Sequence, residues 1–379
     1  MGMRAIKILK SAMKNKDASE NEKYEKVSKE YQLIEEVFKN LKVNVVDGGC
    51  AVITPSYVKY YFKALSQTAY KKALKVESDI TMHLGGYNQV RVYGDICGLE
   101  IYVEVSSNNY DEITLNEALS LLEGHNDGLY FKVGVGEEEV VYNLANAPHL
   151  LVGGATGTGK SCFLTNMVLN LALTKTPEEL NFVFVDPKIV EFSIFGGLPH
   201  LKTPIINETE QFVSFIEKLY EEMEARYEKL SQSKCRNIQS YNEKAKKEGG
   251  EIIPYKVVVI DELADLFYGN KKKMENLLVP ILQKSRAAGI HFVISTQRLS
   301  TDILTSSIFA SVPARAALKT TSYIDSKLIL GSKDAIYLRG AGDLIFKNPA
   351  KTKMERCQVP YVSVPEILSV IGELMKKYS

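Results

Sequence analysis

The 379-residue sequence predicts an α/β fold: a core with a parallel β-sheet, preceded by a small α+β domain of βαββ order. Three observations lead to this prediction. From residue 149 onward, short β-branched runs alternate with amphipathic helical stretches, which is typical of parallel sheets with right-handed crossovers. A glycine-rich loop follows the first of these runs. Between residues 43 and 124, short apolar alternations broken by glycine predominate instead.

The composition is that of an ordinary globular protein, with 45% hydrophobic and 25% charged residues, which excludes disordered and collagen-like chains. A net charge of +1 argues against a protein that coats nucleic acid by bulk charge. No apolar run reaches the roughly 18 to 20 residues of a membrane helix, and residues 1–16 are too rich in lysine for a signal peptide. We therefore expect a cytoplasmic protein without membrane insertion. The five scattered cysteines indicate neither disulfides nor a zinc site.

The chain divides into three predicted segments. Residues 1–42 carry apolar side chains at helical spacing among Lys and Glu, which predicts a helical lead-in exposed to solvent. Residues 43–124 are predicted to form the small α+β domain, with strands in 43–53, 89–93 and 99–105 and a helix in 57–74. Residues 125–379 are predicted to form the main domain, whose first part, up to residue 148, has the composition of a linker.

Within the main domain, strands and helices are predicted to alternate along one sheet. The predicted strands are 149–152, 182–185, 257–260, 292–295, 314–318 and 343–346, and the predicted helices are 160–172, 208–230, 272–287 and 365–377.

The loop after the first of these strands satisfies G-x-x-x-x-G-K-[ST]. Its glycines let backbone N–H groups face phosphate oxygens, and the following helix adds the positive end of its dipole. We expect Lys160 to bridge the β- and γ-phosphates of ATP and Ser161 to bind Mg²⁺. The predicted nucleotide-binding residues are Gly154, Ala155, Thr156, Gly157, Thr158, Gly159, Lys160, Ser161 and Cys162.

Polar residues follow two further strands. Asp261 and Glu262 come directly after a β-branched run; we expect Asp261 to hold Mg²⁺ through water and Glu262 to orient or deprotonate the attacking water. Capping of the next helix is the alternative role for this acidic pair. Gln297 follows the neighbouring strand, where its amide can sense the γ-phosphate or can simply be solvated.

The chain resembles the FtsK/SpoIIIE group of DNA translocases. The resemblance covers about residues 140 to 375, and residues 43–124 are similar to the family's small α domain. It is carried by the segments 148–152, 186–188, 199–201, 223–227, 236–237, 241–244, 261–266, 286–291, 296–298 and 324–326.

The resemblance implies a RecA-like P-loop ATPase that works as a hexameric ring and drives double-stranded DNA through a central channel. It implies that Arg286 is an arginine finger that reaches the ATP of the neighbouring subunit, where a cation stabilises charge on the transferring phosphoryl group. A helix C-terminal arginine is the alternative for Arg286. It also implies that Arg298 and Lys327 contact the DNA backbone and that Tyr323 belongs to the same DNA-binding segment.

The sequence departs from the family at three places. Neither a membrane anchor before the ATPase nor a winged-helix domain after it is expected. Tyr323 and Lys327 stand where the family usually has Lys and Arg, and a point charge grips phosphate less well than a planar guanidinium. We therefore expect a stripped-down DNA motor of a phage, plasmid or other mobile element. A motor for protein cargo and a nucleotide-gated scaffold remain the alternatives.

Overall fold

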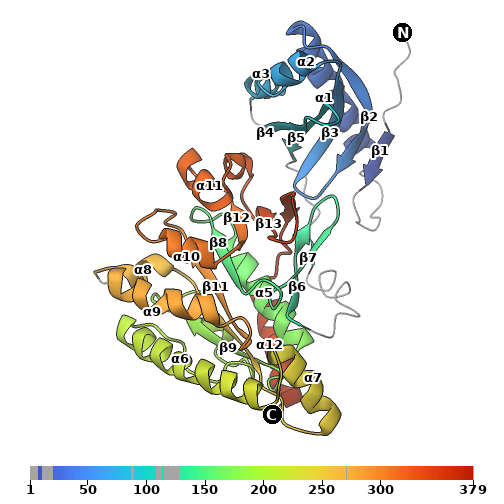
Figure 1. Ribbon diagram of the computed structural model, residues 1–379. Helices are drawn as coiled ribbons and strands as arrows, with labels where there is room; N and C mark the ends of the chain where they lie inside the picture. Colours follow the sequence, from blue (N-terminus) through green and yellow to red (C-terminus); the bar gives the residue numbers. More distant parts are fainter. Residues whose placement is uncertain are drawn as a thin grey trace.

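Two β-sheets organise the chain, one in the small domain and one in the main domain (Figure 1). The structure is a computed structural model that describes residues 7–10, 20–86, 89–107, 113–114, 128–269 and 271–378. The predicted boundary at residue 124, and most of the segment 1–16, lie outside the described residues. Among the described helices, none is both long and apolar enough to cross a membrane.

In its described residues, the small domain packs three helices on a sheet whose strands lie in the order β1-β2-β3-β5-β4. Its elements are β1 (Lys7–Lys10), α1 (Glu20–Asn40), β2 (Val45–Ile53), β3 (Tyr57–Ala64), α2 (Gln67–Ala73), α3 (Glu77–His83), β4 (Val90–Asp95) and β5 (Glu100–Ser106). The pairs β2–β3, β3–β5 and β5–β4 are antiparallel.

Two predictions for this domain are wrong. The first is the helix over 57–74: residues 57–64 form β3 because this run is aromatic and β-branched, and only Gln67–Ala73 is helical. The second is the solvent-exposed helical lead-in. The apolar side of α1 is buried against the sheet, where Tyr31 stacks on Phe62 with ring centroids 4.9 Å apart. The 3.6-residue period therefore marked a core face.

The main-domain sheet has the strand order β7-β6-β14-β13-β12-β8-β11-β10-β9. Its strands are β6 (Tyr130–Val135), β7 (Glu139–Asn143), β8 (His149–Gly153), β9 (Leu180–Val185), β10 (Tyr255–Ile260), β11 (Ile290–Thr296), β12 (Ala314–Leu318), β13 (Asp343–Lys347) and β14 (Glu355–Gln358). Strands β9, β10, β11, β8 and β12 are parallel, which confirms the predicted core.

The remaining part of this sheet is antiparallel, which corrects two predictions. The predicted strand 343–346 exists as β13, but it runs antiparallel to β12. The predicted linker up to residue 148 instead contains the hairpin β6–β7, which joins the sheet through β14. The alternation in these short strands is too brief to distinguish a hairpin from a linker.

Helices cover both faces of the sheet. They are α5 (Lys160–Thr174), α6 (Thr209–Gln232), α7 (Ile238–Glu248), α8 (Leu263–Phe267), α9 (Lys271–Lys284), α10 (Ser306–Ser311), α11 (Tyr323–Leu330) and α12 (Val364–Tyr378), with short 3₁₀ turns η1 (Ser193–Phe195) and η2 (Asp334–Tyr337).

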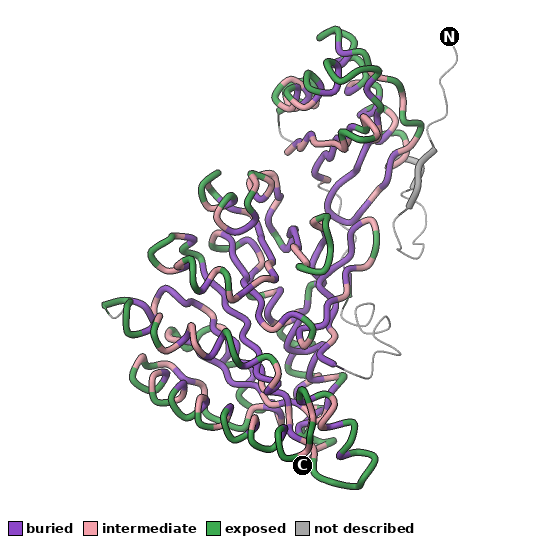
Figure 2. Tube along the Cα trace, in the orientation of Figure 1, coloured by how far each residue is buried: buried purple, intermediate pink, exposed green. Residues whose placement is uncertain are grey.

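Two apolar cores lie on the two faces of this sheet. Along β10, Val257 and Val259 pack into the core that contains α5 and α12, whereas Val258 and Ile260 pack into the core that contains α6 and α9. The strands are accordingly buried and the outer helix faces exposed (Figure 2). Burial on both faces explains why these strands are continuous apolar runs.

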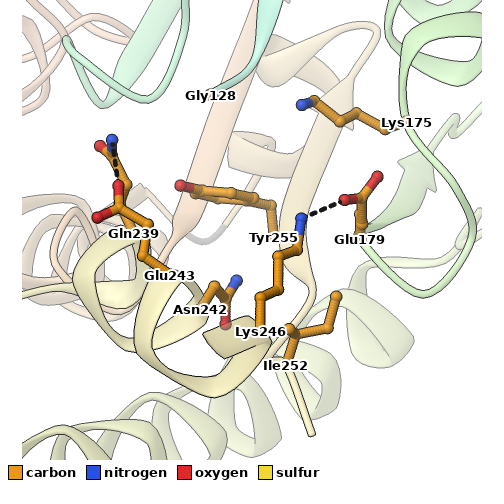
Figure 3. A pocket seen from close by; sticks show the side chains of 9 residues that line it. All are labelled: Gly128, Lys175, Glu179, Gln239, Asn242, Glu243, Lys246, Ile252 and Tyr255. Carbon is orange, nitrogen blue, oxygen red and sulfur yellow. Dashed lines mark hydrogen bonds and ion pairs between the residues drawn. The ribbon is translucent and has the colours of Figure 1, made fainter. Parts of the chain in front are cut away.

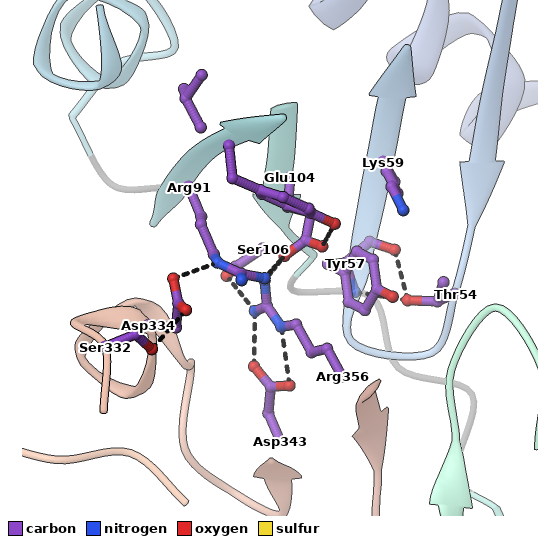
Figure 4. Close-up of polar contacts among 12 residues, drawn as sticks. Thr54, Tyr57, Lys59, Arg91, Glu104, Ser106, Ser332, Asp334, Asp343 and Arg356 are labelled. Carbon is purple, nitrogen blue, oxygen red and sulfur yellow. Dashed lines mark hydrogen bonds and ion pairs between the residues drawn. The ribbon is translucent and has the colours of Figure 1, made fainter. Parts of the chain in front are cut away.

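A buried cluster of charges joins the two domains (Figure 4). Glu104 of β5 accepts a hydrogen bond from Arg356 of β14 at 2.9 Å and one from Arg91 of β4 at 3.1 Å. Arg356 also donates to Asp343 at 2.7 Å, and Arg91 pairs with Asp334 of η2 at 2.8 Å. Because ions out of water are stable only when paired, this cluster holds the domains in one arrangement.

We expect Glu104→Gln to lower the free energy of unfolding by about 3 kcal/mol, because it leaves Arg356 and Arg91 buried with less compensating charge. Chemical denaturation at pH 7 measures the loss. Lys333→Ala, which breaks the exposed pair with Glu77 across the same interface, is the matched control and should cost no more than about 1 kcal/mol. Equal losses for the two variants would contradict this account.

The same substitution should change the acid response. Burial alone would raise the pKa of Glu104, but Arg91 and Arg356 lower it to about 2 from 4.5. A lowered pKa contributes stability that is complete above about pH 4.5 and is lost as the pH falls towards 2. Denaturation series between pH 5 and 2 should therefore show a shallower decline for Glu104→Gln than for the wild type.

Candidate nucleotide site

The ends of three parallel strands meet at one edge of the main sheet. In the β11–β8 ladder Thr296 pairs with Gly153, and in the β10–β11 ladder Ile260 pairs with Ile294. Glu262 lies two residues after Ile260, and Thr296 lies two residues after Ile294, so Glu262 and Thr296 are side by side. The loop 154–159, the acidic pair and the segment after β11 thus leave the sheet together, as the sequence predicts.

The loop 154–159 has the conformation that its glycines allow. Gly157 and Gly159 have φ values of +73° and +109°, a region that side chains disfavour. A Cβ on Gly159 would lie 2.5 Å from the backbone N of Gly342. The N–H of Gly342 donates to the carbonyl of Thr158 at 2.9 Å, so the loop before β13 supports the P-loop directly.

The side chains of Lys160 and Cys162 differ in orientation. The ammonium of Lys160 donates to the carbonyls of Gly154 (2.8 Å) and Ala155 (3.1 Å), inside the loop, and burial lowers its pKa. Phosphate oxygens carry more charge than these carbonyls and are the stronger acceptors. The thiol of Cys162 donates instead to the carbonyl of Pro360, and burial raises its pKa to about 11. Its backbone N–H is therefore the group that can face a phosphate.

Glu262 is buried, and three donors hold its carboxylate. Oε1 accepts from Thr296 Oγ1 at 2.6 Å and from the N–H of Ala264 at 3.2 Å, and Oε2 accepts from the N–H of Gln297 at 2.8 Å. Glu262 thus caps α8, which is the alternative prediction, but its other two bonds go to Thr296 at the end of β11 and to Gln297 directly after it. Thr296 lies in the segment 296–298 that carries the family resemblance, but no role was predicted for its side chain.

The segment after β11 also contacts the P-loop. The side-chain oxygen of Gln297 accepts a hydrogen bond from Thr156 Oγ1 at 2.5 Å. The next residue, Arg298, is exposed. A group that touches the P-loop is therefore followed directly by an exposed cation.

Tyr323 and Lys327 lie one turn apart on the exposed side of α11, with the Lys327 Nζ 6.0 Å from the Tyr323 ring centroid. Leu299 and Ile329 both lie within 3 Å of the point that a Cβ on Gly153 would occupy. The residue after Arg298 and the buried side of α11 are therefore neighbours. The structure brings the three predicted DNA-contact residues to the same end of the sheet as the P-loop.

Arg286 lies at the opposite edge, between α9 and the first residue of β11. Its guanidinium donates to the carbonyl of Asn146 at 2.6 Å. The seven residues of β11 separate it from Gln297, a span of about 23 Å at 3.3 Å per residue. Arg286 therefore does not reach the P-loop of its own chain.

A small pocket also lies at this opposite edge, between α7 and the start of β10 (Figure 3). Two polar pairs line it: Lys246 pairs with Glu179 at 2.8 Å, and Gln239 donates to Glu243 at 3.1 Å. It contains none of the predicted site residues, and we assign it no part in nucleotide binding.

Comparison with known proteins adds independent evidence. The sequence profile of the FtsK/SpoIIIE family matches residues 122–301. The DNA translocase FtsK of Campylobacter jejuni is 35% identical over 340 residues, which are 88% of this chain and 36% of that protein. The chain belongs to the FtsK/SpoIIIE family. It spans about a third of the length of this relative.

Two solved structures have a similar fold. The pCW3 conjugation coupling protein TcpA, in its monomer form with ATPγS, has a TM-score of 0.65 at 20% identity and covers 93% of this chain and 100% of its own. The cytoplasmic domain of the type VII secretion ATPase EccC of Thermomonospora curvata has a TM-score of 0.61 at 28% identity, over 70% of this chain and 34% of its own. Both support the RecA-like P-loop ATPase core of the family.

The edge of the site carries excess negative charge. Burial, with Glu191, Asp186 and Glu262 nearby, raises the pKa of Asp261 to about 6. Asp186 directly follows β9 and accepts from the N–H groups of Lys188, Glu191 and Phe192. Neither Asp186 nor Glu191 was predicted as a site residue, and the Asp-Pro-Lys sequence that begins at Asp186 was the available signal.

A divalent cation fits this excess charge. Within the described residues, His, Cys, Asp and Glu form no group of three that could hold a metal by themselves. Ser161 and Asp261 would therefore share Mg²⁺ with phosphate oxygens and water, which is how this ion is usually held. Mg²⁺ would supply charge neutralisation at the phosphates.

We expect Asp261→Asn to stabilise the protein at pH 7 by on the order of 1–3 kcal/mol. A raised pKa means that the ionised carboxylate costs stability at pH 7; this cost shrinks as the pH falls below about 6 and is gone only below the ordinary value of 3.8. Unfolding measurements at pH 7 and pH 5 test this: the wild type should gain more stability than Asp261→Asn on acidification.

We expect Mg²⁺ and ATPγS together to raise the melting temperature of the wild type, and Asp261→Asn to lose this rise. Asp302→Asn, a change at an acid that is 88% exposed, is the control and should alter stability by less than about 0.5 kcal/mol. An Asp261→Asn protein less stable than the wild type at pH 7 would contradict the account.

Proposed function

We propose that this chain is an ATP-driven motor that moves double-stranded DNA through the channel of a hexameric ring. One observation carries the proposal: at the end of β11, Gln297 contacts the P-loop residue Thr156 while the adjacent Arg298 is exposed. The residue that would detect loss of the γ-phosphate is thus adjacent to Arg298, a cation that can bind the DNA backbone. The name of the Campylobacter relative, a DNA translocase, supports the same substrate.

ATP hydrolysis in this proposal follows from the arrangement of the edge. Lys160 transfers its ammonium from the loop carbonyls to the β- and γ-phosphates, and the backbone N–H groups of the loop bind the phosphate oxygens. Glu262 orients and deprotonates the attacking water. Gln297 senses the γ-phosphate through its position beside Thr156.

The ring follows from the position of Arg286. An arginine at the edge opposite to the P-loop serves a site only if another subunit presents its P-loop there, in a head-to-tail contact. Such heterologous contacts form a ring when the rotation between neighbouring subunits closes on itself. We propose a homo-hexamer on this basis and on the family resemblance.

A motor for protein cargo is the second candidate, because a type VII secretion ATPase has a similar fold at 28% identity. The two candidates differ in what stimulates the ATPase. Duplex DNA should raise the rate of a DNA motor, whereas a motor for protein cargo should not respond to it.

We expect Arg298→Ala and Lys327→Ala to weaken binding to duplex DNA and its stimulation of the ATPase, because each removes an exposed cation. Each lost phosphate contact should reduce the steepness of the slope of log K against log salt concentration by about 0.9. Binding titrations at several salt concentrations give this slope. Lys229→Ala, at an exposed position of α6, is the matched control; wild-type slopes for the first two variants would refute the DNA-contact assignment.

We expect Lys160→Ala and Arg286→Ala to be inactive as separate proteins, since the first loses the phosphate cation and the second the finger. A mixture should regain part of the ATPase activity, because some interfaces then pair an intact P-loop with an intact Arg286. The steady-state rate of the mixture at varied ratios measures this. A fully active monomer would exclude the ring.

A further inference from the structure

The hydroxyl of Thr296 occupies the space between Glu262 and the segment that leads to Arg298. Thr296 is completely buried. Its Oγ1 donates to Glu262 Oε1 at 2.6 Å and accepts from the N–H of Arg298 at 3.1 Å. The carbonyl of Arg298 lies 3.3 Å from the same oxygen. We propose that Thr296 is the positioning residue for Glu262 and ties it to the segment of Arg298; this rests on the proposed function.

The register of the parallel strands places Thr296 beside Glu262. Thr296 pairs with Gly153, the last residue of β8, while Glu262 stands two residues beyond Ile260 in the adjacent strand. A side chain at position 296 is thus between the P-loop strand and the acidic pair. The β-branched residue fits the strand, and its hydroxyl supplies the one side-chain donor to Glu262 among the described residues.

The hydrogen bonds decide how Glu262 can act. A carboxylate has about four lone-pair positions. At Glu262, Oε1 uses two for Thr296 and Ala264, and Oε2 uses one for the N–H of Gln297. The remaining position, on Oε2, accepts the proton of water. Without Thr296, Oε1 keeps only the 3.2 Å bond to Ala264, and the carboxylate can rotate.

The link to Arg298 follows from proton count. A hydroxyl has one proton, and Thr296 has two acceptors for it, the carboxylate of Glu262 and the carbonyl of Arg298. A shift of the Arg298 segment towards Thr296 moves this proton away from Glu262. Contact of Arg298 with DNA thereby changes how firmly the water-activating carboxylate is held.

The test compares Thr296→Val, which removes the hydroxyl at nearly constant shape, with Thr296→Ser, which keeps it. Ser295→Ala is the matched control: Ser295 is a buried neighbour whose hydroxyl has no partner among the described residues. Binding of ATPγS and the kcat and KM for ATP are measured for each, with and without duplex DNA. Thr296→Ala replaces the valine variant if the latter does not fold.

We expect Thr296→Val to bind ATPγS and to keep its KM within about twofold of the wild type, with kcat lowered on the order of tenfold to a hundredfold, since misplacing a general base has effects of this size. Thr296→Ser should recover to within about threefold, and Ser295→Ala should match the wild type. A kcat for Thr296→Val within twofold of the wild type, or an equal loss in Ser295→Ala, overturns the inference.

Glu262→Gln separates this result from the proposed function. If the wild type hydrolyses ATP and Glu262→Gln stalls, but Thr296→Val does not, the inference about Thr296 fails alone. If Glu262→Gln turns over at the wild-type rate, the proposed role of Glu262 fails, and the inference fails with it. If duplex DNA stimulates the wild type and Thr296→Val by the same factor, the link to Arg298 is overturned while the proposed function stands; if it does not stimulate the wild type, the proposed DNA motor fails and the link fails with it.

Discussion

The parallel register of β8, β11 and β10 is the constraint on which the site depends. Because Gly153, Thr296 and the position of Glu262 stand level at one edge, three segments far apart in sequence need no long loops to meet. Each residue of register shift would move a strand end by about 3.3 Å, enough to break the contacts of Glu262. The two faces of β10 pack into different cores, so a one-residue slip would exchange Val257 and Val259 with Val258 and Ile260 between those cores and disrupt the packing of both.

Arg286 lies at the other end of the same parallel strands, where they start. Parallel strands all start at one end of the sheet and all finish at the other, so the P-loop and Arg286 lie at opposite ends of the same strands. In the proposed motor, only a second copy can bring Arg286 to a P-loop. The asymmetry of the parallel strands thus accounts for the head-to-tail contact of the proposed ring.

The sequence predicts local features well and pairing features poorly. The P-loop, the acidic pair and the central strands follow from contiguous motifs and apolar runs, and the structure has them where they were predicted. By contrast, β3 was assigned to a helix and the β6–β7 hairpin to a linker, because their short alternating runs depend on partners distant in sequence. The roles of Thr296 and Glu191 were not predicted for the same reason, because they depend on neighbours that only the fold brings close.

The charge cluster at the domain interface connects to the P-loop through the backbone. The N–H of Gly342 binds the carbonyl of Thr158, and the next residue, Asp343, binds Arg356, which holds Glu104 of the small domain. Separating buried ions costs free energy, so Asp343, Arg356 and Glu104 are expected to move as one unit. A displacement of the P-loop at Thr158 is therefore opposed by the docked small domain. The small domain thus constrains the nucleotide site although none of its described residues belongs to the predicted set.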